Sequence, residues 1–410
     1  KDGKTCFPMD AAEFGTYGPK LLAAGATYLG GCCGTTPAHI QALADAVRGL
    51  PEPERKNGRR MLQLASRSRT VTIDRDLPTT LIGERINPTG RKKLAAEIKD
   101  GSLLSVKKEA VNQVKAGARL LDVNMGVGGI DQAAAMKRAI REIAQITDAP
   151  LVIDTSDARA LEAGLRAYPG RALINSVSAE DNRIKEFLPL AKKYGAAILC
   201  LPIGEEGVPK TAEARFAATK YIIDEAANYG LTEGDFLLDA LVMTVSADKN
   251  ACREVLDTLR LYRERLGYPS TMGLSNISFG LPNRPLINST FFAMCLAGGL
   301  DAPIMNPYDE KMQDALMASR ALLGFDPNGI EFSKVAANLA APKKAAVAKT
   351  TDLPILEAIK QAVIDGEKDE IAGLVTRALE EGNEGNEITE KALTAAMNDT
   401  LLGYAAQGKY

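Results

Sequence analysis

Eight short apolar segments, each followed by a stretch with helical periodicity, restrict the fold of this chain more than any other feature. The segments are residues 79–83, 119–123, 150–153, 172–174, 196–202, 236–238, 270–274 and 302–305. Each has the length of a buried strand, and the stretches between them are long enough for crossover helices. Eight β/α units in about 260 residues match the (β/α)8 barrel in number and size. The pattern predicts an α/β fold of the TIM-barrel type; the alternative, a doubly wound sheet, rarely uses eight equal repeats.

Changes in composition predict where the domains begin and end. Residues 51–70 are polar, basic and contain proline, and residues 335–353 are rich in Ala, Lys and Pro, so both read as linkers. The predicted barrel, 71–334, lies between them. Residues 354–410 show only helical patterns and predict a small all-α domain, whereas residues 1–50 end in a single helical segment. Because the chain begins with Lys1 rather than Met, we expect it to be a piece of a longer protein.

Composition excludes several classes of function. His39 is the only histidine, so a histidine-containing triad or a site with several histidine ligands is not expected. The 50 Lys and Arg residues nearly balance the 52 Asp and Glu residues, which argues against a nucleic-acid partner. No apolar run approaches the roughly 20 residues of a membrane span. Six cysteines without a signal-peptide pattern predict reduced thiols and a cytoplasmic protein.

Polar side chains follow all the predicted strands except 196–202. In a barrel of this type the chemistry lies at the carboxyl ends of the strands. A ring of carboxylates and carboxamides without His or Cys suits a planar heterocycle rich in N–H donors, such as a pterin or a purine. The alternative is that each residue caps a helix or begins a turn. The residues at these ends are Glu84, Asp122, Asn124, Asp154, Asn175, Asp239, Ser275, Asn276 and Asn306.

Seven sequence motifs fall within residues 72–333. They are LIGERINPTGRKKL (81–94), GARLLDVNMG (117–126), LVIDTSD (151–157), RALINSVS (171–178), FLLDAL (236–241), MGLSNISFGLPNRPLINSTF (272–291) and GLDAPIMNP (299–307). Together they resemble the pterin-binding barrel of methyltetrahydrofolate methyltransferases. Dihydropteroate synthases have a similar barrel but lack the GLSN–FGLPNR string.

The flanking segments resemble parts of cobalamin-dependent methionine synthase. Residues 29–40, LGGCCGTTPAHI, look like the last strand and helix of its homocysteine-binding domain, so Cys32 and Cys33 correspond to two of three zinc thiolates. Residues 355–382 look like its helical cobalamin cap, which would be incomplete at Tyr410. The family's DxHxxG cobalt-ligand motif does not occur in the sequence. The resemblance therefore implies that cobalamin is bound mainly outside this chain, by a cobalamin-binding domain of the same or another chain.

The resemblance also implies a role for each candidate side chain. Asn276 corresponds to the amide that contacts folate N5, while Asp154 and Asp239 correspond to residues that hold the aminopyrimidine edge; these three are the expected catalytic set. Asn175 is expected to orient the ring. Because neither His nor Cys ends a strand, we expect the N5 proton to come from solvent. The remaining expected folate contacts are Glu84, Asn87, Asp122, Asn124, Ser275, Arg284 and Asn306.

The expected function is methyl transfer from N5 of 5-methyltetrahydrofolate to cob(I)alamin, as part of methionine synthesis from homocysteine. One alternative is a stand-alone methyltransferase that serves a separate corrinoid protein. Another is a piece of chain that binds folate but no longer reacts.

Overall fold

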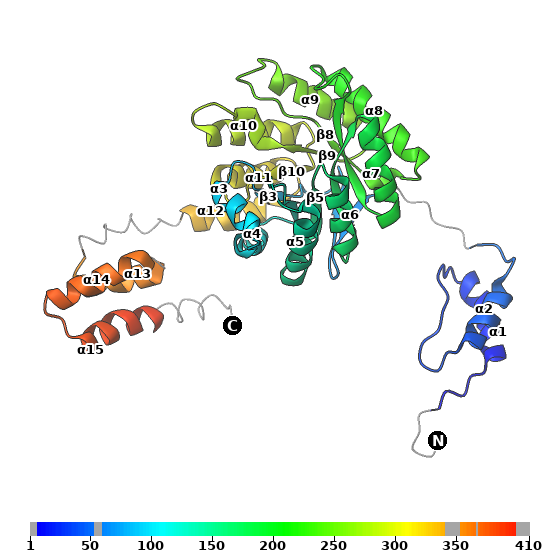
Figure 1. Ribbon diagram of the computed structural model, residues 1–410, viewed down its shortest axis with the longest axis horizontal. Helices are drawn as coiled ribbons and strands as arrows, with labels where there is room; N and C mark the ends of the chain where they lie inside the picture. Colours follow the sequence, from blue (N-terminus) through cyan, green and yellow to red (C-terminus); the bar gives the residue numbers. More distant parts are fainter. Residues whose placement is uncertain (1–5, 53–59, 341–352, 366–367, 399–410) are drawn as a thin grey trace.

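The computed structural model describes residues 6–52, 60–340, 353–365 and 368–398. Its largest unit is a closed barrel of parallel strands in the order β10-β3-β4-β5-β6-β7-β8-β9. The ring of helices around it confirms the predicted (β/α)8 fold (Figure 1). The strands are β3 Ile82–Ile86, β4 Leu120–Asn124, β5 Leu151–Asp154, β6 Leu173–Ala179, β7 Ala197–Gly204, β8 Phe236–Asp239, β9 Ser270–Gly273 and β10 Ala302–Met305.

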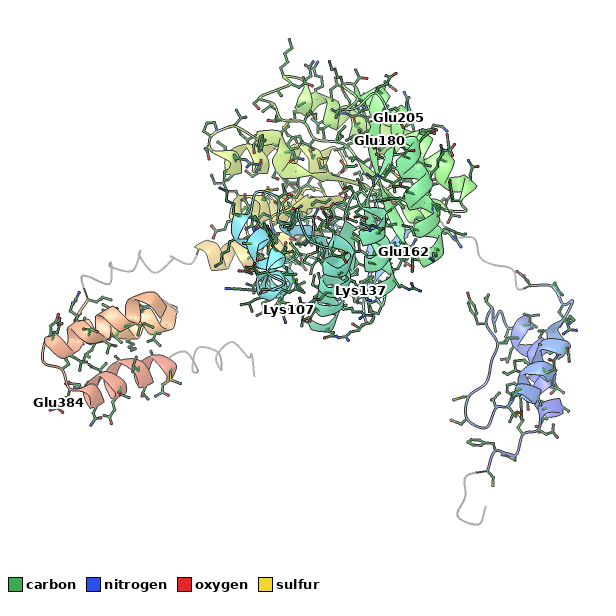
Figure 2. The ribbon with its side chains drawn as sticks, viewed as in Figure 1. Lys107, Lys137, Glu162, Glu180, Glu205 and Glu384 are labelled. Atoms are coloured by element: carbon green, nitrogen blue, oxygen red, sulfur yellow. The ribbon has the colours of Figure 1, made fainter. Side chains whose placement is uncertain are left out.

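Four of the surrounding helices begin at a short polar side chain that caps them. Asp131, Asp157, Thr211 and Asp309 each accept a hydrogen bond from a backbone N–H of the helix that follows. Charged side chains such as Lys107, Lys137 and Glu162 lie on these outer helices (Figure 2). The helices are α3 Lys92–Lys99, α4 Leu104–Lys115, α5 Gln132–Ile146, α6 Ala158–Ala167, α7 Asp181–Tyr194, α8 Ala212–Asn228, α9 Ala251–Leu261, α10 Arg284–Ala297, α11 Glu310–Leu322 and α12 Ile330–Ala340.

All eight predicted strands exist, and the bounds of two differ from the prediction by three residues or more. The first strand, predicted at 79–83, is β3 and begins at Ile82, because Thr80 bonds to the Asp301 carbonyl outside the sheet. The fourth, predicted at 172–174, continues as β6 to Ala179 alongside β7. Glu84 and Asn175 therefore lie within their strands rather than after them.

A hairpin that the sequence analysis did not predict closes the amino-terminal end of the barrel. Strand β1 (Leu62–Ala65) pairs antiparallel with β2 (Thr70–Ile73), and β1 falls within the predicted linker 51–70. Leu62 and Leu64 are buried in the barrel interior against the first inward-facing residues of the strands. The linker prediction is thus wrong from residue 62, because two alternating leucines provide a buried face beside a basic stretch.

Residues 6–52 form a separate helical pair. Helix α1 (Ala11–Ala23) packs on α2 (Pro37–Val47), where Gly15 and Gly18 allow close contact. The strand expected at the start of residues 29–40 is not formed. Residues 29–36 are irregular, and residues 6–52 contain no strand with which they could pair. His39 lies in the first turn of α2, where its Nδ1 lies 2.8 Å from the hydroxyl of the N-cap residue Thr36.

The carboxyl-terminal unit is helical, as predicted. Helices α13 (Ile355–Asp365), α14 (Lys368–Glu380) and α15 (Gly385–Ile388) are followed by the π-helical turn η6 (Thr389–Thr394). The residues of the predicted cap beyond 398 lie outside the described part of the chain. Across the described residues, we find no helix with the length and apolarity needed to cross a membrane. The hydrophobic cluster in this unit consists of Ile355, Ile359, Ala378, Ile388 and Ala392.

Candidate active site at the barrel mouth

Strand periodicity places the candidate side chains inside the barrel mouth. Successive side chains of a strand point to opposite faces, so residues two apart share a face. Leu120, Val152, Leu173 and Leu237 belong to the buried interior cluster. The residues two positions further along the same strands are Asp122, Asp154, Asn175 and Asp239. These polar groups therefore form the layer above the apolar interior, at the carboxyl ends of the strands.

Asp154 is the acceptor at the centre of this layer. Nδ2 of Asn124, on the neighbouring strand, donates to Oδ2 of Asp154 over 2.9 Å. Nδ2 of Asn87, in the loop after β3, approaches the same oxygen to 3.5 Å. Three of the predicted folate contacts thus come together from three consecutive β/α units.

Asp122 lies deeper in the barrel than Asp154, because its partner across the strand pair is Val152. The two carboxyl groups differ in how readily they ionise. Only 3% of its surface is exposed, and its Oδ1 accepts a 3.0 Å hydrogen bond from Nδ2 of Asn175. Burial, followed by the nearby carboxylate of Asp154, raises the pKa of Asp122 well above its usual range. Burial raises the pKa of Asp154 as well, so two carboxyl groups this close do not both ionise readily. Asp122, the more deeply buried, holds its proton more tightly than Asp154 does.

Asp239 belongs to the same inner layer, at the end of β8. Burial raises the pKa of Asp239 to about 7, although the Leu241 N–H and the charge of Arg215 both oppose that rise. The Leu241 N–H donates to Oδ1 of Asp239 over 2.7 Å. The second oxygen is thus available to a ligand.

Glu84 lies on β3, beside the strand that carries Asp122. Its charge contributes to the raised pKa of Asp122. Burial raises the pKa of Glu84 itself, and Arg85 and Arg284 partly offset the effect. The predicted contacts of the inner layer are therefore brought together by the fold.

The loop after β9 contributes residues of a second type. Asn276 lies in the short helix η3 (Leu274–Ser278) and is exposed. Arg284 donates to the Ser275 carbonyl over 2.7 Å and to the Ser278 hydroxyl over 3.0 Å, so it braces this loop. Asn306 Oδ1 accepts from the Tyr308 N–H and forms a turn after β10. These side chains lie outside the hydrogen-bonded inner layer: Ser275 and Asn276 in η3, Arg284 at the start of α10 and Asn306 in the turn after β10.

Comparison with known proteins agrees with this geometry. The family model described as pterin binding enzyme matches residues 83–306, which span the barrel strands and every candidate of the inner layer. The chain belongs to the pterin-binding enzyme family. The family model described as homocysteine S-methyltransferase matches residues 2–47, the amino-terminal helical part.

Two curated relatives of this pterin-binding chain confirm the resemblance expected from its motifs. The methionine synthase of Mycobacterium tuberculosis is 31% identical over 92% of the chain, which spans only 33% of that protein. The methylcorrinoid:tetrahydrofolate methyltransferase of Eubacterium limosum is 32% identical over 62% of the chain and 94% of the relative. The chain thus spans a third of the first relative's length and nearly all of the second.

Among solved structures, the chain is similar to the dihydropteroate synthase of Thermus thermophilus. It is 17% identical, with a TM-score of 0.48, and the match covers 63% of this chain and 99% of that one.

Cys32 and Cys33 supply only part of a zinc site. Their Sγ atoms lie 3.6 Å apart, and both side chains are exposed. Structural and catalytic zinc sites use at least three protein ligands. Within residues 6–52 and the other described segments, no group of three or more His, Cys, Asp or Glu residues could hold a metal ion. The two thiols therefore do not by themselves form a site that fits zinc.

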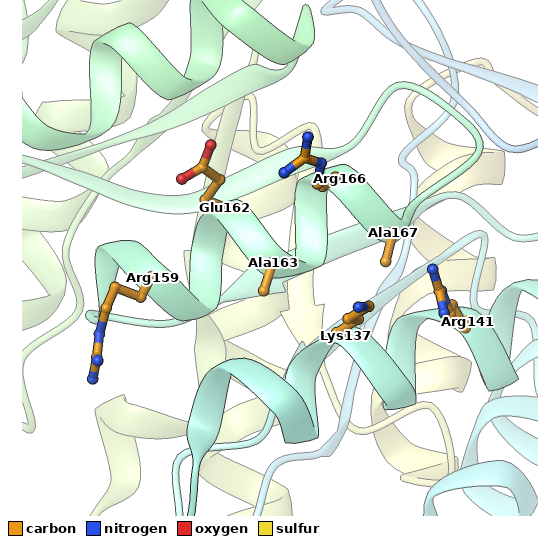
Figure 3. Close-up of a pocket in the computed structure, with 7 residues that line it drawn as sticks. All are labelled: Lys137, Arg141, Arg159, Glu162, Ala163, Arg166 and Ala167. Carbon is orange, nitrogen blue, oxygen red and sulfur yellow. The ribbon is translucent and has the colours of Figure 1, made fainter.

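A groove of about 560 Å³ lies on the outer wall of the barrel between α5 and α6 (Figure 3). Its lining includes Lys137, Arg141, Arg159 and Arg166 and one carboxylate, Glu162, which forms an ion pair with Lys193. The groove contains none of the predicted site residues. Because its cationic side chains are exposed, we assign it to the solvated surface of the helices.

The sequence analysis missed two residues, Arg215 and Tyr262, that contact the backbone at Asp239 from the helices outside the barrel. Arg215 and Tyr262 are completely buried outside the strands and bond to the backbone at the end of β8. They come from α8 and from the π-helical turn η2 (Tyr262–Leu266), so no local motif connects them to the site.

Proposed function

We propose that the barrel mouth binds 5-methyltetrahydrofolate and that the chain promotes transfer of its N5 methyl group to cob(I)alamin. The observation that carries this proposal is the layer of acceptors and amides above the apolar interior, in which Asp122 and Asp239 are buried and Asp154 and Asn175 are half-buried. A reduced pterin offers several ring N–H groups and an amino group, which such acceptors match.

Each polar group has a definite part in binding. The carboxylates of Asp154 and Asp239 accept hydrogen bonds from the aminopyrimidine edge and the ring N–H groups. Asn175, fixed by protonated Asp122, presents its carbonyl oxygen to the ring. The apolar interior below this layer excludes water from the lower face of the site.

The chemical difficulty lies at N5. When the bond between N5 and the methyl carbon breaks, both electrons stay on nitrogen, so an unprotonated N5 would leave as an anion. A proton on N5 lets it leave as a neutral amine, with the methyl passing to the corrinoid, which supplies the nucleophile. The exposed carboxamide of Asn276 accepts a hydrogen bond from that N5–H and stabilises the protonated substrate.

The similarity to methionine synthases supports a wider assignment, in which the same polypeptide also methylates homocysteine. On this proposal, cobalamin and most of the homocysteine site are bound by residues outside those described. Cys32 and Cys33 would serve that second step together with a further ligand.

A single-turnover reaction tests the central proposal. The chain is mixed with 5-methyltetrahydrofolate and exogenous cob(I)alamin, and the cob(I)alamin absorption is followed. Loss of that absorption at a rate that depends on the chain is the expected result. Binding of folate without turnover would contradict methyl transfer and favour a folate-binding module.

A second candidate is a stand-alone methyltransferase acting on a separate corrinoid protein. The observation that favours it is the E. limosum relative, of which this chain covers 94%. Sequencing the native gene distinguishes the two. A DxHxxG motif downstream supports the methionine synthase assignment, whereas a gene that lacks this motif supports the second candidate.

A further inference from the structure

The carboxylate of Asp239 is held by contacts made behind the barrel wall. The Tyr262 hydroxyl donates to the backbone carbonyl of Asp239 over 3.0 Å. Nη1 of Arg215 donates to the next carbonyl, that of Ala240, over 3.2 Å. Two consecutive carbonyls at the end of β8 are thus bound from outside the strand.

These contacts fix an unusual turn. Leu241 has a φ of 56°, in the left-handed region that a leucine seldom adopts, and its N–H points at Oδ1 of Asp239. A residue keeps such a conformation only where its surroundings impose it. Because the turn supplies the N–H that orients the carboxylate, the bonds that hold the turn also orient Asp239.

Arg215 is a buried cation whose hydrogen bonds compensate its burial only in part. Its side chain is completely buried, its Nε bonds to the Pro209 carbonyl at 3.3 Å, and its Nη2 has no partner in the described part of the chain. A buried guanidinium is costly unless its charge is compensated. The charged groups that face it are Glu254 on α9, Asp248 in the preceding loop, and Asp239.

We propose that Arg215 and Tyr262 are positioning residues for Asp239: Arg215 favours its ionised form, and Tyr262 fixes its orientation toward the pterin. This inference rests on the proposed function, in which Asp239 accepts hydrogen bonds from the folate ring. The ring needs the carboxylate in its acceptor form and in one direction, and two different side chains supply these two requirements.

The two contributions have separate signatures. Arg215 is the charged group that acts on Asp239 from behind the wall, and its positive charge lowers the pKa that burial raises to about 7. Its removal therefore moves the pH at which the ligand-binding form appears to a higher value. The Tyr262 hydroxyl is neutral and bonds to the backbone, and the Thr219 hydroxyl, 2.6 Å away, fixes its direction. Its removal loosens the turn without changing the charge near Asp239.

The test measures the dissociation constant of 5-methyltetrahydrofolate by equilibrium dialysis from pH 6 to pH 9. The variants are Arg215→Met, Arg215→Lys and Tyr262→Phe in the full chain. Tyr168→Phe is the matched control, because the Tyr168 hydroxyl also holds backbone, donating to the Ala65 carbonyl over 3.0 Å at the opposite end of the barrel. Thermal unfolding of every variant monitors the fold.

For Arg215→Met we expect the midpoint of the affinity–pH curve to rise by half a unit or more, with affinity restored at high pH. For Arg215→Lys the midpoint stays within about 0.2 units of the wild type. Tyr262→Phe weakens binding about three- to tenfold at every pH, as expected for one lost hydrogen bond. Tyr168→Phe changes neither quantity.

An unchanged midpoint in Arg215→Met, or equal losses of affinity in Tyr262→Phe and Tyr168→Phe, would overturn the inference. If Arg215→Met does not fold, a wild-type affinity in Tyr262→Phe overturns it instead. If the wild type itself does not bind 5-methyltetrahydrofolate, the proposed function fails, and that outcome is distinct from binding with an unshifted midpoint.

Discussion

Asn175 donates a 3.0 Å hydrogen bond to Asp122 across the mouth of the barrel, although β5 separates their strands. The amide thereby binds the carboxyl of the pair that holds its proton more tightly, while Asp154, whose pKa burial also raises, ionises more readily. The inner layer thus places a protonated carboxyl and its amide partner beside the carboxyl that is the better acceptor. This arrangement presents different hydrogen-bonding groups to different atoms of one ligand.

The first prediction follows from that difference in charge. Asn in place of protonated Asp122 keeps a donor toward Asp154 and an acceptor toward Asn175, so Asp122→Asn should change the affinity for 5-methyltetrahydrofolate less than threefold at pH 7. Asp154→Asn removes the anion and should weaken binding at least tenfold, the scale of one charge-assisted hydrogen bond. Equilibrium dialysis measures both. Asp157→Asn, at the cap of α6, is the control. Equal losses in the Asp122 and Asp154 variants would contradict the assigned protonation.

The second prediction concerns Asn276. Asn276→Ala should lower the single-turnover rate of methyl transfer by roughly 10- to 1000-fold, as expected for one hydrogen bond to the transition state. The exposed position of Asn276 implies little change in stability. The rate is measured with exogenous cob(I)alamin, and Asn250→Ala, an exposed residue before α9, serves as the control. A change of less than twofold would remove Asn276 from the mechanism.

Much of the barrel could be predicted because each strand is a short apolar run with one inward and one outward face. Their positions at the ends of predicted strands predicted that Asp122, Asp154, Asn175 and Asp239 would gather at the carboxyl end of the barrel. The sequence could not predict the proton on Asp122, since that depends on burial and on a carboxylate from the adjacent strand. It also could not connect Arg215 and Tyr262 to Asp239, because the three are distant in sequence and belong to different elements.

The hairpin of β1 and β2 was missed for a related reason. Its hydrophobic residues are few and stand beside a basic stretch, so local composition indicates a linker. Their burial depends on an opening at the base of the barrel that exists only after all eight strands have closed. The contact is therefore long-range, and short-range periodicity does not contain it.

The third prediction tests whether the hairpin of β1 and β2 belongs to the barrel core. Leu64 is completely buried, so Leu64→Ala should destabilise the barrel by about 2–5 kcal/mol through lost burial and the cavity that remains. Chemical denaturation of the full chain measures the change. Leu77→Ala, at a partly exposed leucine just after the hairpin, should cost much less. A small effect at Leu64 would show that the hairpin is not part of the barrel core.

The fourth prediction concerns pH and the base of the barrel. Burial raises the pKa of Asp301 to about 6, although the Ser270 N–H and hydroxyl donate to its carboxylate. A raised pKa means that the folded state binds the proton more tightly, so stability is lost as pH rises toward 6 and levels off above it. Asp301→Asn does not titrate. Between pH 5 and pH 8 the wild type should therefore lose about 1.4 kcal/mol relative to the variant, the equivalent of one pKa unit. Denaturation at both pH values measures it, and a constant difference would contradict the raised pKa.

The last prediction concerns the source of the N5 proton. Asp239 has a pKa of about 7 and Asp122 retains its proton, so both could in principle donate one. Asp239, however, is expected to hold the pterin edge, where ring N–H groups favour the ionised acceptor and lower its pKa again. Asp122 bonds to Asn175 rather than to the ligand. We therefore expect N5 to take its proton from solvent, with Asn276 and one Asp stabilising the protonated form. On this view no single substitution of Asp by Asn abolishes transfer while leaving folate affinity intact. Measuring both quantities for Asp154→Asn and Asp239→Asn decides the matter. A variant with wild-type affinity and transfer reduced more than about a thousandfold, or about 4 kcal/mol of barrier, would identify that Asp as a dedicated general acid.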